Sequence, residues 1–124
     1  EVVGVEGDQK LVDRAKINAK HNAIHNAQFF VADLNFDISS QLWKTQRFNK
    51  ILLDPPRSGA LEVLKQLNLK GVDKIVYVSC HPASLARDAG YLVNECGYRL
   101  VKAGAMDMFP QTAHVESIAV FEAQ

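Results

Sequence analysis

A cysteine at residue 80 has the most reactive setting in this sequence. Cys80 directly follows the apolar run 74–79, which is typical of a strand, and comes two residues before Pro82. Proline suits the first turn of a helix, and a helix amino terminus favours the thiolate form of cysteine. We therefore interpret Cys80 as a candidate nucleophile. The alternative is a small buried hydrophobe, the role we expect for Cys96.

Carboxylates follow three other apolar segments, at Glu6, Asp33 and Asp54. Ligands of open α/β sheets bind beyond the carboxyl ends of the strands. Glu6 suits a pair of ribose hydroxyls, Asp33 suits an adenine amino group, and two prolines after Asp54 would hold that carboxylate rigidly. The alternatives are an exposed loop acid for Glu6, a turn former for Asp33 and a rigid turn at Asp54.

Two further segments carry polar side chains suited to a substrate. Arg57 follows the proline pair and would contact a phosphate or pair with a neighbouring acid. The segment 108–116 places a proline and several polar residues before a strand, which suggests a shaped loop facing a substrate. His114 and Glu116 are its candidate proton acceptors, while a structural histidine and an exposed glutamate are the alternatives.

These residues need a scaffold of alternating strands and helices. Apolar runs and turn residues alternate along the chain, which predicts one compact α/β domain over residues 1–124 with a mainly parallel sheet. The last strand is expected to be antiparallel, at the far side of the sheet. The predicted strands are 2–6, 28–31, 48–53, 74–79, 98–102 and 115–121, and the predicted helices are 9–22, 58–67 and 82–95.

Composition limits the class of protein. The 124 residues carry 14 basic and 14 acidic side chains, so the sequence lacks the basic excess of a stand-alone nucleic-acid-binding domain. Two cysteines without a disulfide framework favour the cytoplasm, and no apolar run is long enough to span a membrane. The histidines have the wrong spacing for a metal site, so we predict none. Because the sequence opens directly on a strand, we expect it to be part of a longer protein.

Three motifs together resemble the RNA (uracil-C5) methyltransferases, most closely the bacterial type that acts on 23S ribosomal RNA. The resemblance covers the whole chain, and the three motifs occur in order with the family's spacing. They are Leu53-Asp54-Pro55-Pro56-Arg57-Ser58-Gly59, Tyr77-Val78-Ser79-Cys80-His81-Pro82-Ala83-Ser84-Leu85-Ala86-Arg87-Asp88, and Asp107-Met108-Phe109-Pro110-Gln111-Thr112-Ala113-His114-Val115-Glu116-Ser117.

The resemblance implies an activity and a role for each candidate residue. Cys80 would add to C6 of a uracil that has been flipped out of its stack, and Glu116 would later remove the C5 proton. Glu6, Asp33 and Asp54 would bind S-adenosylmethionine. Asp54, Arg57 and His114 would contact the RNA, which is expected to be 23S ribosomal RNA.

The resemblance also implies a fold and several departures from it. The fold would be the Rossmann-like class I methyltransferase fold, here without its first strand and Gly-rich loop. Exposed sheet edges would favour a homodimer or strand swapping, and the chain alone would be inactive. An N-terminal RNA-binding domain and a 4Fe-4S cluster would belong to other parts of the parent enzyme. A transfer RNA uracil-C5 methyltransferase and a non-catalytic Rossmann-like interaction domain remain alternatives.

Overall fold

The computed structural model describes residues 1–124, and its contacts divide the chain into two compact units. The first unit covers residues 1–46 and the second covers residues 47–124. None of the helices combines the length and the apolar character that crossing a bilayer requires. The prediction of one catalytic domain over residues 1–124 stays a prediction.

The first unit is a two-stranded parallel sheet with a helix between its strands. β1 (Val2–Glu6) leads to α1 (Gln9–His21), β2 (Ala27–Val31) and the short 3-10 helix η1 (Leu42–Thr45). Glu6 of β1 pairs with Val31 of β2, so both strands end at the same edge. Helix α1 begins where the Asp8 carboxylate accepts a hydrogen bond from the backbone N–H of Lys10 at 2.7 Å. The buried side chains of this unit include Val12, Ala19, Ala32, Ile38 and Trp43.

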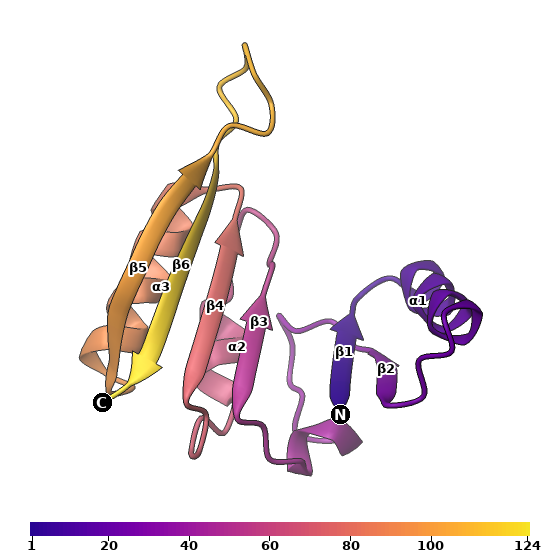
Figure 1. Cartoon of the computed structure of the whole chain (residues 1–124). Helices are drawn as coiled ribbons and strands as arrows, with labels where there is room; N and C mark the ends of the chain where they lie inside the picture. Colours follow the sequence, from indigo (N-terminus) through magenta and orange to yellow (C-terminus); the bar gives the residue numbers. More distant parts are fainter. The chain divides into compact units, whose positions relative to one another are not determined.

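The second unit contains a four-stranded sheet with the order β3-β4-β6-β5. Strands β3 and β4 are parallel, whereas β6 is antiparallel to both of its neighbours, β4 and β5 (Figure 1). The elements are β3 (Lys50–Leu53), α2 (Leu61–Gln66), β4 (Lys74–Ser79), α3 (Pro82–Asn94), β5 (Tyr98–Met106) and β6 (Glu116–Ala123).

Burial alternates along β4 because successive side chains point to opposite faces of the sheet. Ile75, Tyr77 and Ser79 are buried, and Tyr77 bonds to α3, so this face carries the core of the unit. Helix α3 packs against β4 and β5. Ala119 and Phe121 of β6 lie directly opposite Tyr77 and Ile75 and complete the buried layer.

The predicted number and order of strands and helices are confirmed, and the last strand is antiparallel as predicted. The predicted place of that strand at the far side of the sheet is wrong, because β6 lies between β4 and β5. The edge position goes to β5, whose residues are mostly exposed, whereas β6 buries Ala119 and Phe121. A strand whose side chains are buried gains more from an interior position than a strand whose side chains are exposed.

Candidate active site

The turn that carries Cys80 is held on both sides by hydrogen bonds. Cys80 is half-buried and lies between the last residue of β4 and the residue that caps α3. Ser79 Oγ donates to the carbonyl of His81 and accepts from its N–H, both at 3.0 Å. His81 Nδ1 lies 2.7 Å from Ser84 Oγ, one turn into the helix. The predicted strand-to-helix setting of Cys80 is therefore confirmed, with Pro82 in the first turn of α3.

Glu116 begins β6 beside the end of β4. Ser79 is paired with Ser117, and Ser117 Oγ donates to the Ser79 carbonyl at 3.2 Å. This is the last pair between β4 and β6, and Cys80 and Glu116 are the next residues along the two segments. The pairing therefore brings together the ends of the two strands that carry the candidate nucleophile and the candidate base.

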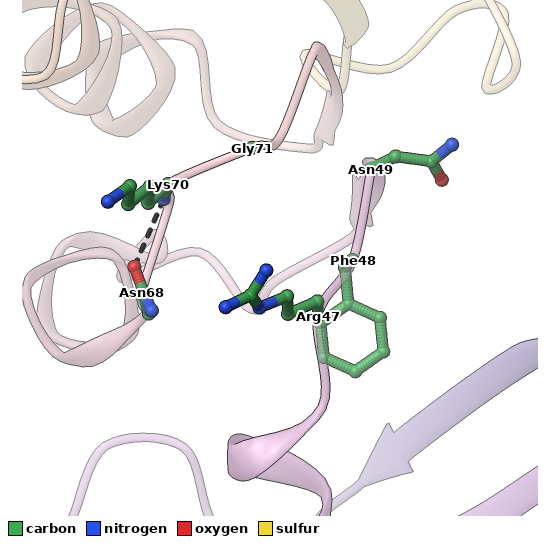
Figure 2. Close-up of a pocket in the computed structure, with 6 residues that line it drawn as sticks. All are labelled: Arg47, Phe48, Asn49, Asn68, Lys70 and Gly71. Carbon is green, nitrogen blue, oxygen red and sulfur yellow. Dashed lines mark hydrogen bonds between the residues drawn. The ribbon is translucent and has the colours of Figure 1, made fainter.

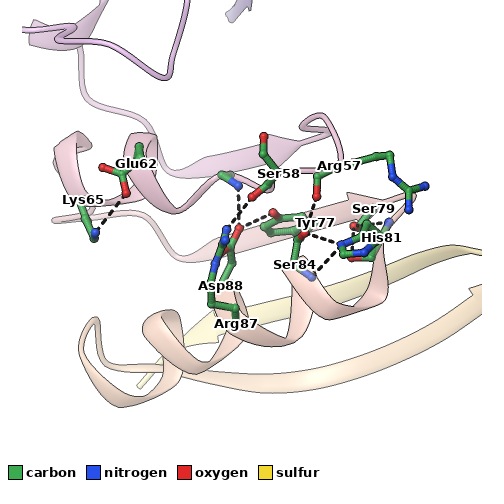
Figure 3. A network of polar contacts seen from close by, with 11 residues as sticks. Arg57, Ser58, Glu62, Lys65, Tyr77, Ser79, His81, Ser84, Arg87 and Asp88 are labelled. Carbon is green, nitrogen blue, oxygen red and sulfur yellow. Dashed lines mark hydrogen bonds and ion pairs between the residues drawn. The ribbon is translucent and has the colours of Figure 1, made fainter.

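Asp54 and Arg57 lie in the segment of residues 54–60, called the 54–60 loop, between β3 and α2. Both side chains are exposed, and Figure 3 shows Arg57 beside the polar network that its backbone joins. The backbone is held, however, because the Arg57 carbonyl accepts a hydrogen bond from Ser84 Oγ. A fixed backbone with free side-chain ends suits residues that must reach a bound ligand.

Sequence reasoning missed the buried carboxylate of Asp88. Its side chain is 0% exposed, and its Oδ2 accepts from the N–H of Ala60 and from the hydroxyl of Tyr77, each at 2.6 Å. Burial is the main cause that raises the pKa of Tyr77 far above its ordinary value, and the hydrogen bond to Asp88 is the next. The phenol therefore stays protonated and acts as a donor. A charged residue on the inner face of an otherwise amphipathic helix was the available signal.

In the first unit, Glu6 and Asp33 come together at the carboxyl edge of the sheet. Glu6 is the last residue of β1, and the Ala32 N–H donates to its carbonyl at 3.1 Å. Asp33 follows β2 and accepts from the backbone N–H and the side-chain amide of Asn35, at 3.0 and 2.9 Å. Asp33 is thus the turn former of the alternative interpretation, while its second carboxylate oxygen is left for another partner.

The third motif forms the segment of residues 107–115 between β5 and β6, called the 107–115 loop, which extends beyond the sheet (Figure 1). His114 is exposed, and its N–H donates to Thr112 Oγ1 at 3.2 Å. The rings of Phe109 and His114 meet edge to face with their centres 6.2 Å apart. The role of His114 in substrate binding stays a prediction.

A cavity of about 350 Å³ in the second unit contains none of the predicted residues. Its walls come from the segments that precede β3 and β4, whereas Asp54 and Cys80 follow the opposite ends of these strands (Figure 2). It is lined by Arg47, Phe48, Asn49, Asn68, Lys70 and Gly71. No cluster of histidine, cysteine and acidic side chains is arranged to hold a metal ion.

Comparisons with known proteins identify relatives of the chain by sequence and by fold. The chain is 71% identical over 122 residues to the 23S rRNA (uracil(1939)-C(5))-methyltransferase RlmD of Xanthomonas oryzae pv. oryzae, covering 98% of the chain and 28% of that relative. The chain thus spans less than a third of the length of the curated relatives it matches.

Solved structures share the fold at low sequence identity. The Streptococcus pneumoniae protein Sp1610, a putative tRNA (m1A22) methyltransferase, matches with a TM-score of 0.73 and 14% identity over 98% of the chain and 52% of that structure. TYW2 of M. jannaschii, in complex with AdoMet, matches with a TM-score of 0.63 and 15% identity over 98% of the chain and 57% of that structure. The fold is the Rossmann-like class I methyltransferase fold. The family model described as tRNA (uracil-5-)-methyltransferase matches residues 1–124, and the chain belongs to that family.

Proposed function

We propose that the protein containing this chain transfers a methyl group from S-adenosylmethionine to C5 of a uridine in 23S ribosomal RNA. The proposal rests on one observation above all, the pairing of Ser79 with Ser117, the neighbours of Cys80 at the end of β4 and of Glu116 at the start of β6. Family membership and the 71% identical relative named for a 23S rRNA uridine support it.

In this proposal Cys80 and Glu116 act in sequence on one uracil. The Cys80 thiolate adds to C6, which makes C5 a carbon nucleophile. S-adenosylmethionine supplies the electrophilic methyl group when it is bound. Glu116 then accepts the C5 proton, and the electron pair of that C–H bond restores the C5–C6 double bond as the thiolate leaves. Both side chains must reach the C5–C6 edge of the same pyrimidine. The pairing of Ser79 with Ser117, the neighbours of Cys80 and Glu116, suits this requirement.

The remaining candidate residues bind and orient. Glu6, Asp33 and Asp54 each lie at or just after the carboxyl end of a parallel strand, and exposed carboxylates there suit the hydroxyl and amino donors of a nucleoside. A neighbour of the same fold was solved in complex with AdoMet. Asp54 and Arg57 on the 54–60 loop and His114 on the 107–115 loop would contact the RNA, with the guanidinium suited to a phosphate. The 4Fe-4S cluster implied by the resemblance stays a prediction about segments outside this chain.

The test traps the covalent step in the full-length protein. The enzyme is incubated with S-adenosylmethionine and 23S ribosomal RNA containing 5-fluorouridine, and the attachment site of any denaturation-stable adduct is mapped. Fluorine cannot leave as a proton, so we expect an adduct on Cys80. The Cys80→Ala variant should form none, whereas Cys96→Ala, which changes the other half-buried free cysteine, should form it normally.

Transfer RNA is the alternative substrate, because the matching family model carries that description. Parallel reactions with 5-fluorouridine-containing transfer RNA separate the two. An adduct with ribosomal RNA alone supports the proposal. An adduct with transfer RNA alone would show that transfer RNA is the substrate instead. No adduct with either RNA would overturn uracil-C5 methylation.

A further inference from the structure

Helix α3 holds the 54–60 loop through three side chains, one of which lies a helical turn before the other two. Ser84, Arg87 and Asp88, called the α3 clamp, have the spacing that places residues on one side of a helix. Figure 3 shows the clamp between the helix and the loop. The acidic member is fully buried, which is costly unless both oxygens are paired.

Every member of the α3 clamp bonds to the loop backbone. Ser84 Oγ donates to the Arg57 carbonyl, Arg87 Nη2 donates to the Ser58 carbonyl at 2.7 Å, and Asp88 Oδ2 accepts from the Ala60 N–H at 2.6 Å. Three bonds to nearly successive residues leave this backbone little freedom.

The α3 clamp is itself tied to the helix and to β4. Arg87 binds Asp88 Oδ1 through Nε at 2.8 Å and Nη2 at 2.7 Å, while the Tyr77 hydroxyl from β4 donates to the other oxygen. Ser84 also contacts the ring of His81, the residue after Cys80. The same helix face therefore contacts both the 54–60 loop and the turn that carries the thiol.

Gly59 shows how closely the loop and the clamp fit. A Cβ atom at this position would lie 2.6 Å from both Arg87 Nη2 and Asp88 Oδ2, and the backbone has φ +86°. Gly97, just after the other end of α3, has φ +75°, but a Cβ there would have no neighbour within 4 Å. The two glycines share the left-handed backbone and differ in their contact with the clamp.

We propose that Asp88, with Arg87 and Ser84, is a positioning residue that fixes the 54–60 loop relative to the Cys80 turn. The inference deepens the proposed function, because it assigns to α3 the placement of Asp54 and Arg57 around the uracil that Cys80 attacks. In this proposal the α3 clamp acts on the loop backbone and not on the substrate. Its contribution to the reaction is geometric, and a misplacement of about 1 Å in an active site can slow a reaction about 10²-fold.

The first test compares Gly59→Ala with Gly97→Ala in the full-length protein. Both changes place a β-carbon at positive φ, so both strain the backbone, but only Gly59→Ala pushes the loop away from the clamp. At saturating RNA and well below the unfolding temperature, we expect Cys80 adduct formation to slow about 10-fold to 10²-fold in Gly59→Ala. Gly97→Ala should stay within about 3-fold of the wild type, since its added methyl group meets nothing. Equal rates in the two variants would overturn the positioning role.

A second test needs no activity. Hydrogen exchange of the Ala60 amide should be slow in the wild type and in Gly97→Ala, and fast in Asp88→Asn, which loses an acceptor oxygen. The Tyr77→Phe variant removes one donor to Asp88, and Tyr98→Phe is its matched control, since it loses a buried bond to the Val72 carbonyl instead. Unchanged exchange in Asp88→Asn overturns the clamp itself. An enzyme that forms no adduct overturns only the uracil chemistry.

Discussion

The 54–60 and 107–115 loops both carry candidate substrate-binding residues, but they are held in different ways. The 54–60 loop is bonded at three backbone positions to side chains of α3. The hydrogen bonds found in the 107–115 loop join its own residues, and Met108, Phe109 and Val115 are 61%, 48% and 42% exposed. The backbone of the first loop is thus fixed by α3, whereas the second loop is held by bonds among its own residues.

The largest effect on product formation is expected from a change at Glu116, where the 107–115 loop joins β6. Glu116→Gln keeps the shape of the side chain but removes the proton acceptor, so the Cys80 adduct should form and persist while product formation falls about 10²–10⁴-fold. Denaturing gels measure the persisting adduct, and the release of free methylated RNA over many turnovers measures product formation.

Glu122→Gln is the matched control for Glu116→Gln. Glu122 lies on the same strand and the same face, but it pairs with Lys74 and Arg99, both at 3.1 Å. We expect its turnover to stay near that of the wild type. Equal losses in the two variants would contradict the assignment of Glu116 as the base.

A smaller effect is expected for the exposed arginine of the 54–60 loop. Arg57→Ala leaves the bond to the Arg57 carbonyl intact, so only the guanidinium is lost. The RNA concentration for half-saturation should rise about 10-fold, as for the loss of one charge-assisted phosphate contact. Arg99→Ala removes an exposed arginine that pairs with Glu122 and should change this value little. An unchanged value for Arg57→Ala would mean that the loop positions no RNA contact.

A still smaller effect is expected in the 107–115 loop. Phe109→Ala removes the ring contact with His114, and an aromatic pair contributes about 0.5–1.5 kcal/mol, or roughly 2-fold to 10-fold in affinity. We expect weaker RNA binding in a filter or fluorescence assay, with an unchanged unfolding temperature. A large drop in the unfolding temperature would show that this loop is as firmly built as the 54–60 loop.

The smallest effect is expected in the pH dependence of the unfolding temperature. It depends on Tyr77, which bonds to the Asp88 carboxylate that holds the 54–60 loop. The raised pKa of Tyr77 means that its neutral form stabilises the fold below the ordinary tyrosine value of about 10, and that this stabilisation is lost as pH rises above it. Between pH 9 and 11 the unfolding temperature should fall less steeply in Tyr77→Phe than in the wild type. Burial also raises the pKa of Tyr98, and this residue contributes equally to the pH dependence of the wild type and of Tyr77→Phe. If the unfolding temperature falls equally steeply with pH in both proteins, the raised pKa of Tyr77 is contradicted.

Much of this arrangement was predictable from local patterns. The apolar run before Cys80 and the proline after it predicted a strand and a helix, and both are confirmed. The three motifs predicted the family, which is also confirmed. The assigned roles of Cys80, Glu116, Glu6, Asp33, Asp54, Arg57 and His114 stay predictions. The place of β6 was wrong, since a strand's neighbours depend on which side chains the whole sheet buries.

The sequence by itself determined the types and order of the reactive residues, because strand ends, proline turns and helix starts are encoded within a few neighbouring residues. Only the tertiary structure decided that Asp88 binds Ala60 across 28 positions and that Ser79, beside Cys80, pairs with Ser117, beside Glu116. Such pairings depend on strand register and on the cost of burying a charge without partners, and neither is readable from one local segment.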